Sequence, residues 1–218
     1  MFMDIIMSIL LSVVVYISVN SAYMLYFDKE EISLKKVLFC GKECCAAAAA
    51  AAVFLGLFGI YQGSSIYMYD YIRCVIIITA LAFLAVVDYK ERIIPNKILA
   101  VLFLIWLLIT AIFIFKDIQM ALYKIFTAAV GGAFAFFAFG ITYIVSKKML
   151  GAGDVKLAVI MGIYLGAERI FGAVLYGAVL SALFSIIGLI SKKLTKADNI
   201  PFAPFLFIGA LITLFVKV

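Results

Sequence analysis

Two aspartates have the residue type and the position to carry out hydrolysis. Asp88 follows the apolar run IIITALAFLAVV, and Asp154 closes the tetrapeptide GAGD just before a second apolar run. A carboxylate at the end of an apolar helix in a membrane is costly when charged and therefore suggests a function. Two carboxyl groups that lie together share one proton, so one acts as a base toward water while the other donates to a scissile carbonyl. The pair therefore indicates aspartyl peptidase chemistry.

An alternative interpretation gives the same two aspartates no chemistry. Each is followed two residues later by a lysine, Lys90 after Asp88 and Lys156 after Asp154. The aspartates would then be interfacial charges that are solvated by lipid headgroups or paired with these lysines. Their position in the sequence is compatible with both interpretations.

The residue types that are missing narrow the chemistry. The chain contains no histidine, which excludes His-dependent catalytic triads and H-E-x-x-H metalloproteases. Its four cysteines follow the spacing C-x3-C-C with one distant residue, which does not match the C-x2-C pairs of zinc sites. We therefore expect no metal ion and no cofactor.

The neighbours of the two aspartates favour a close approach of the backbone. Gly151 and Gly153 permit positive φ and carry no Cβ atom, so another chain can lie near the carboxylate of Asp154. Pro95 cannot continue a helix, and Asn96 can cap the next one, so the segment after Asp88 predicts a fixed turn. The GxGD pattern alone is weak, and Pro95 and Asn96 are also compatible with an ordinary turn.

The elements that must position these residues are transmembrane helices. Of 218 residues, 68% are hydrophobic and 14% are charged, and the mean hydropathy is +1.26, which together are typical of an integral membrane protein. A bilayer core requires about 20 apolar residues per helix. We predict an all-α, polytopic transmembrane bundle of about eight helices, at residues 4–27, 44–61, 66–87, 98–115, 121–145, 155–166, 169–190 and 202–217. The sixth is too short to cross a bilayer and is expected to be a partial helix.

The distribution of basic residues predicts the orientation. Assigning alternate loops to the two sides places most of the 18 lysines and arginines on one side, which the positive-inside rule makes cytoplasmic. The N-terminus is then outside, and Asp88 and Asp154 lie at the cytoplasmic boundary of the cell membrane. The loops account for the net charge of +6, so no nucleic-acid partner is expected. The first apolar run, from Ile5, has no preceding basic residue and is predicted to be a retained span.

Several glycines predict helix packing rather than chemistry. Gly162 and Gly166 form a G-x-x-x-G pair, and Gly131 and Gly132 interrupt an aromatic-rich span. Such glycines commonly mark close helix contacts or bends.

Three blocks of sequence together resemble the type IV prepilin peptidase family of GxGD membrane aspartyl proteases. They are D-x-x-x-x-x-I-P-N at 88–96, G-x-G-D-x-K-L at 151–157 and N-I-P-F-A-P-F-L at 199–206. We therefore expect a single integral membrane peptidase domain over 1–218, with an extra N-terminal span and loop at 1–36 and a peptidase core at 37–218.

The resemblance implies an endopeptidase that removes the basic leader of prepilin-like proteins, such as type IV pilins, preflagellins and pseudopilins. Cleavage would occur at the cytoplasmic face, just before the hydrophobic helix of the substrate. Asp88 and Asp154 would be the catalytic pair, because each occupies the aspartate position of a matching motif. Lys156 would be a supporting cation near the second aspartate. The third block would pack around the site, and no chemistry is assigned to it.

The sequence departs from the family pattern at two places. Longer members carry two C-x-x-C pairs between their first two spans, a region associated with N-methylation, whereas the loop at about 28–43 is short and has a different cysteine spacing. We therefore predict cleavage without methylation. The third block has Ala203 where glycine is common, which leaves the catalytic assignment intact.

Three other functions remain as alternatives. A presenilin-like intramembrane protease also uses a GxGD aspartate, but its partner motif Y-D lies within a span. An ion- or proton-coupled transporter could bind a cation with two aspartates, although it would place them near mid-span. A non-catalytic pilus assembly scaffold would tolerate the loss of both aspartates.

Overall fold

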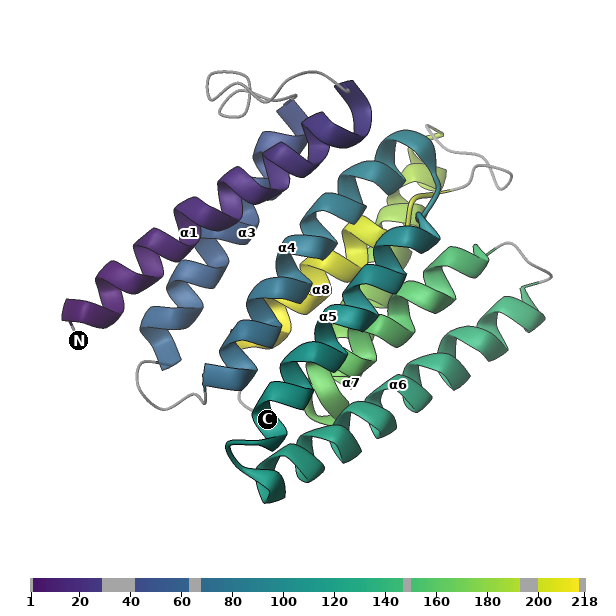
Figure 1. The fold of residues 1–218 in the computed structure, drawn as a ribbon. Helices are drawn as coiled ribbons and strands as arrows, with labels where there is room; N and C mark the ends of the chain where they lie inside the picture. The colour runs from purple at the N-terminus through teal and green to yellow at the C-terminus, as the bar shows by residue number, and fades with distance from the viewer. Residues whose placement is uncertain (1, 29–41, 63–67, 147–149, 193–199, 216–218) are drawn as a thin grey trace.

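The described part of the chain is a bundle of helices. The computed structural model describes residues 2–28, 42–62, 68–146, 150–192 and 200–215, and every regular element in these ranges is helical (Figure 1). In chain order they are α1 (Phe2–Tyr23), the π-helix η1 (Met24–Asp28), α3 (Lys42–Gln62), α4 (Met68–Glu91), α5 (Asn96–Ile114), α6 (Ile118–Val145), α7 (Ala152–Ile190) and α8 (Ala203–Phe215). The predicted all-α fold is confirmed. The expected boundary between 1–36 and 37–218, most of the short loop at 28–43 and Asn199 of the third block lie outside the described residues.

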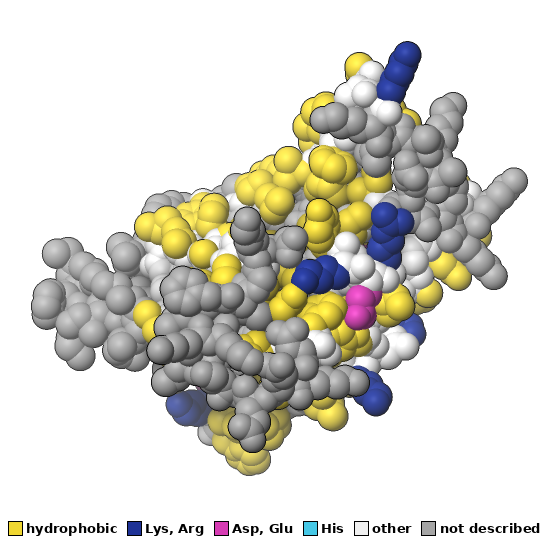
Figure 2. All heavy atoms as spheres, turned by 90° about the horizontal axis from the view of Figure 1, so that it is seen from above, with side chains coloured by type: hydrophobic (Ala, Val, Ile, Leu, Met, Phe, Trp, Pro, Cys, Tyr) yellow, Lys and Arg dark blue, Asp and Glu magenta, His cyan; other side chains and the backbone are white. Residues whose placement is uncertain are grey.

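The helices have the length and composition of membrane spans. Among the described residues, α4, α5, α6 and α7 are long and apolar enough to cross a bilayer, and shorter apolar segments lie in α1, α3 and α8. In lipid, backbone polar groups must pair within their own segment, so apolar runs of this length fold as helices. Figure 2 views the bundle from the end at which α4 ends and shows basic side chains around a small acidic patch among apolar side chains. The chain is therefore a helical membrane protein.

Two of the eight predicted helices form one element. Segments 155–166 and 169–190 both belong to α7, whose backbone leaves helical geometry at Gly166, with φ 73° and ψ 174°. The interruption lies where the boundary between the two predicted helices was expected, so both are present and are joined directly at Gly166. The first segment also begins at Ala152, three residues earlier than predicted, because Asp154 takes part in the first helical turn.

The chain reverses its direction at Gly166, so the two segments of α7 run opposite ways (Figure 1). The contacts of α8 with the second segment establish the direction. A Cβ atom on Gly172 would lie 3.3 Å from Cγ2 of Thr213, and one on Gly177 would lie 3.3 Å from Cα of Leu206. The later residue of α7, Gly177, lies beside the earlier residue of α8, Leu206. The second segment of α7 and α8 are therefore antiparallel. The second segment therefore returns toward the end of the bundle at which α8 begins.

The first segment of α7 packs closely on α6 at glycines. A Cβ atom added to Gly131 would lie 2.5 Å from the carbonyl oxygen of Gly162 and 2.8 Å from the carbonyl carbon of Gly166. No side chain fits between backbones that are so close. The predicted close helix contact at these residues is confirmed.

Replacement of Gly166 by alanine should destabilise the protein. Residues other than glycine rarely adopt its combination of φ and ψ, so we expect Gly166→Ala to lower the free energy of unfolding by about 1–3 kcal/mol. Thermal unfolding in detergent micelles measures the change. Gly140→Ala is a matched control, since its Cβ atom would have no neighbour within 4 Å and alanine favours helix over glycine. Equal unfolding temperatures for the two variants would contradict the assigned role of Gly166.

Candidate active site

Asp88 lies in the last turn of α4 and is buried, with 5% of its surface exposed. The helix ends three residues later at Glu91, and Arg92 adopts a left-handed conformation with φ 55°. The N–H of Arg92 donates to the carbonyl oxygen of Asp88 at 2.9 Å, which closes this helix end. The chain then runs extended to Pro95, the N-cap of α5. The turn predicted after Asp88 is therefore built by Arg92 and Pro95.

The carboxylate of Asp88 is held by the third sequence block. The backbone N–H of Ala203, the first residue of α8, donates to Oδ2 of Asp88 at 2.9 Å. The first N–H groups of a helix lack intrahelical partners, and the positive end of the helix dipole favours an anion there. This hydrogen bond was not predicted, because the third sequence block was expected only to pack around the site. Pro201 and Pro204 were the available signal, because prolines cluster at the start of helices.

Asp154 lies in the first turn of α7 and is held by its own loop. Its backbone N–H donates to the carbonyl oxygen of Gly151 at 3.0 Å, and the N–H of Gly151 donates to Oδ2 of Asp154 at 3.2 Å. The second carboxylate oxygen, Oδ1, is buried and has no hydrogen-bond partner among the described residues. One oxygen of Asp154 thus fixes the side chain, and the other is available to a ligand.

Of the two properties that glycine offers in GAGD, positive φ and the absence of a Cβ atom, the structure uses the second. Gly151 has φ −69°, and Gly166 is the one glycine with positive φ among the described residues. Neither Gly151 nor Gly153 therefore uses the positive φ that glycine permits. What Gly153 requires is space, since its Cβ atom would lie 3.0 Å from Cβ of Ile94. This contact brings the start of α7 against the turn between α4 and α5.

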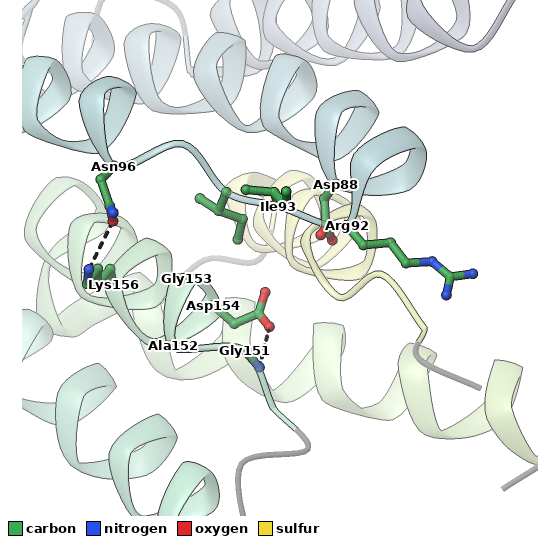
Figure 3. A pocket seen from close by; sticks show the side chains of 10 residues that line it. Asp88, Arg92, Ile93, Asn96, Gly151, Ala152, Gly153, Asp154 and Lys156 are labelled. Atoms are coloured by element: carbon green, nitrogen blue, oxygen red, sulfur yellow. Dashed lines mark hydrogen bonds between the residues drawn. The ribbon is translucent and has the colours of Figure 1, made fainter. Parts of the chain in front are cut away.

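The close approach places both aspartates in one pocket of about 260 Å³. Figure 3 shows their carboxylates directed into it from α4 and α7. The other residues that line the pocket are Arg92, Ile93, Ile94, Asn96, Gly151, Ala152, Gly153 and Lys156. A pocket of this size has room for several water molecules, each of which occupies about 30 Å³. Water can therefore reach a place beside both carboxyl groups.

Asn96 and Lys156 bond to each other. Nζ of Lys156 donates to Oδ1 of Asn96 at 2.9 Å (Figure 3). The N-cap of α5 is Pro95, with no side-chain cap hydrogen bond, so the prediction that Asn96 caps this helix is wrong. Asn96 and Lys156 both line the pocket. The bond joins α5 to α7 across the pocket.

The lysine that follows Asp88 is bound by aromatic side chains of the N-terminal helices. The ammonium group of Lys90 donates to the hydroxyl of Tyr23. It also lies 4.6 Å from the centroid of the Tyr23 ring and 5.2 Å from that of Phe27. Tyr26 donates to the carboxylate of the next residue, Glu91, at 3.0 Å. The N-terminal helices therefore contact the residues beside Asp88.

Fold and site together define a helical membrane protein with two carboxylates in one pocket at an end of its bundle. Comparison with protein-family models matches residues 75–186 to the type IV leader peptidase family. The chain belongs to this family and is a peptidase. The matched region runs from α4 into the second segment of α7 and contains Asp88 and Asp154. Neither the comparison with curated proteins nor that with solved structures gave a match.

A methyl group at Gly153 should reduce peptidase activity. In Gly153→Ala the new Cβ atom lies 3.0 Å from that of Ile94, so the start of α7 must shift. We expect cleavage to slow by about tenfold, because small misplacements of reacting groups are costly. The double variant Gly153→Ala/Ile94→Gly, which removes the opposing side chain, should recover part of the rate. Each loss of rate can be expressed as an increase in activation free energy. If the increase in the double variant equals the sum of the increases in Gly153→Ala and Ile94→Gly, the contact does not position the site.

Proposed function

We propose that this protein is a membrane-embedded aspartyl endopeptidase that removes the basic leader peptide of prepilin-like proteins. Asp88 and Asp154 are its catalytic pair. The observation that carries the proposal is the shared pocket, in which two carboxylates from separate helices meet within a chain of the type IV leader peptidase family. Two adjacent carboxyls that share a proton supply both the base and the acid of peptide hydrolysis.

In the proposed reaction, a water molecule lies between the two carboxyl groups. One carboxylate takes a proton from this water as it attacks the scissile carbonyl carbon, and the other carboxyl donates a proton to the carbonyl oxygen. The tetrahedral intermediate then collapses, and the leaving amine takes up a proton. Asp88 is held in place by Ala203 and Asp154 by Gly151. The reaction forms no acyl-enzyme and uses no metal.

The substrate strand has an open approach along the GAGD segment. Gly151 and Ala152 are exposed beside the pocket, and Gly151 carries no side chain to obstruct an extended peptide. The hydrophobic helix of a prepilin-like protein would lie in the bilayer beside the bundle, with its leader beyond the membrane boundary. The spacing of the cysteines supports cleavage without N-methylation.

The proposed active site faces the cytoplasm. Lys90, Arg92 and Lys97 lie at or just beyond the end of α4, near the pocket. Basic residues next to spans favour the cytoplasmic side, where a basic leader would remain during synthesis. The position of the aspartates weighs against a transporter, because Asp88 is in the last turn of its helix and Asp154 in the first turn of its own. A site for an ion in transit is expected near mid-span.

Co-expression with a prepilin-like protein from the same genome tests the proposal. We expect a gel shift that corresponds to loss of the leader, and intact-mass analysis should give a product that begins at the hydrophobic helix without an added methyl group. A protease-protection assay with a tag on the leader locates the cleavage. Failure to cleave any prepilin-like protein encoded with this chain, at normal levels of enzyme in the membrane, would overturn the proposed substrate class.

A further inference from the structure

A buried arginine lies at the far end of α4 from Asp88 and has no part in the proposed reaction. Arg73 is 3% exposed and is separated from Asp88 by about 22 Å of helix at 1.5 Å per residue. A cation inside an apolar bundle is costly unless its partners replace water. The partners of Arg73 therefore indicate what its position serves.

Arg73 bonds to the backbone at the reversal of α7. Its Nη2 atom donates to the carbonyl oxygen of Ile163 at 2.9 Å and to that of Tyr164. Both residues belong to the last turn before Gly166. The final carbonyls of a helical segment lack the amide partners that a continuous helix provides, and a cation there complements the helix dipole. The guanidinium of Arg73 therefore caps the first segment of α7.

The same arginine is held in place by neighbours from its own helix and from α6. Its Nη1 atom lies 3.5 Å from Oδ1 of Asp70, and its guanidinium lies 5.1 Å from the ring centroid of Tyr69. Nζ of Lys124, on α6, lies 2.9 Å from Oδ2 of Asp70. The hydroxyls of Tyr69 and Thr110, on α5, are 2.8 Å apart. These contacts join four helices at the end of the bundle opposite the pocket.

The first segment of α7 is thus held at both ends, at one by the turn that follows α4 and at the other by α4 itself. Gly153 packs on Ile94 at the pocket end, and Arg73 binds the carbonyls at the reversal. We infer that Arg73 is a positioning residue for the peptidase, which fixes this segment so that Asp154 lies opposite Asp88. The inference rests on the proposed function for its effect on catalysis. Its geometric part, the separation of the two side chains, can be tested without activity.

Kinetic measurements test the catalytic part. In Arg73→Met, the carbonyls of Ile163 and Tyr164 lose their donor, and we expect kcat to fall by about 10- to 100-fold through misplacement of Asp154. KM should stay within about threefold of the original value, because Arg73 does not line the pocket. Arg73→Lys should restore part of kcat, since an ammonium group can still donate to a carbonyl. Arg169→Met is the matched control. It removes a cation beyond the reversal that donates to Sγ of Cys74 instead, so its kcat should be unchanged.

Cross-linking tests the geometric part in enzyme that is already inactive. Cysteines replace Asp88 and Asp154 in a background whose four native cysteines are alanine, and thiol-reactive linkers of graded length report their separation. We expect Arg73→Met to shift the most efficient linker to a greater length, Arg73→Lys to shift it less, and Arg169→Met to leave it unchanged. An unchanged profile in Arg73→Met would overturn the inference, even if activity is lost. If Arg73→Met shifts the linker profile but the original enzyme cleaves no prepilin-like protein, the positioning role stands and the proposed function is overturned.

Discussion

Substitution of either Asp88 or Asp154 by asparagine is expected to slow leader cleavage by about 10²- to 10⁴-fold, the range for loss of a general acid or base. Asparagine keeps the size of the side chain but cannot exchange a proton at neutral pH. Both variants should be tested because the two carboxyls act as one unit in the proposed reaction. Purified enzyme and a synthetic substrate with a leader and an apolar segment give the rates, and immunoblots of membranes give the enzyme levels.

The control for these variants is the same chemical change at the start of α6, outside the pocket. Asp117 is exposed and caps α6, accepting from the N–H of Met120 at 3.0 Å. Asparagine caps helices about as well as aspartate, so Asp117→Asn should retain full activity. Cleavage that survives in either Asp88→Asn or Asp154→Asn would rule out the carboxylate pair and return the two aspartates to the role of interfacial charges.

Replacement of Ala203 by proline is the second change with a large expected effect. Proline removes the N–H that donates to Oδ2 of Asp88 at 2.9 Å and places ring carbon atoms near the same oxygen. The backbone should otherwise tolerate it, because Ala203 is the first residue of α8, a position that proline favours. We expect cleavage to slow by about 10²-fold through displacement of Asp88, with little change in the unfolding temperature.

Ala203→Gly is the matched variant because it keeps the backbone N–H. Its rate should remain close to that of the original enzyme. If Ala203→Pro cleaves as fast as Ala203→Gly, the hydrogen bond to Asp88 has no role in the reaction.

The helices could be predicted because their sequences leave the backbone few alternatives in a membrane. Their ends were less certain, since they depend on single local contacts. The fifth predicted helix was expected to begin at 121, but the corresponding α6 begins at Ile118 because Asp117 caps it. Similarly, α7 begins at Ala152 because Asp154 and Gly151 bond to each other in its first turn.

The chemistry of the pocket was predictable only in part. Asp88 and Asp154 were distinguished by residue type and by their position at the ends of apolar runs. Their meeting in one pocket depends on how α4 and α7 pack, and no local pattern encodes the packing of Gly153 on Ile94, where an added Cβ atom would lie 3.0 Å from that of Ile94. The donor from Ala203 is a backbone group, so no side-chain pattern marks it. Asn96 was expected to cap its helix from local preference, but a distant lysine binds it instead.

The reversal at Gly166 determines which side of the membrane α8 starts from. A straight helix of 39 residues would be about 58 Å long, nearly twice the thickness of a bilayer core of about 30 Å. It would also deliver the chain to the opposite leaflet, where the first amide of α8 could not reach Asp88. The first segment of α7 is only about 21 Å long and does not cross the core, and by folding back at Gly166 the chain returns to the end of the bundle at which α7 began. A single residue with positive φ therefore places three distant segments of the chain at the same face of the membrane.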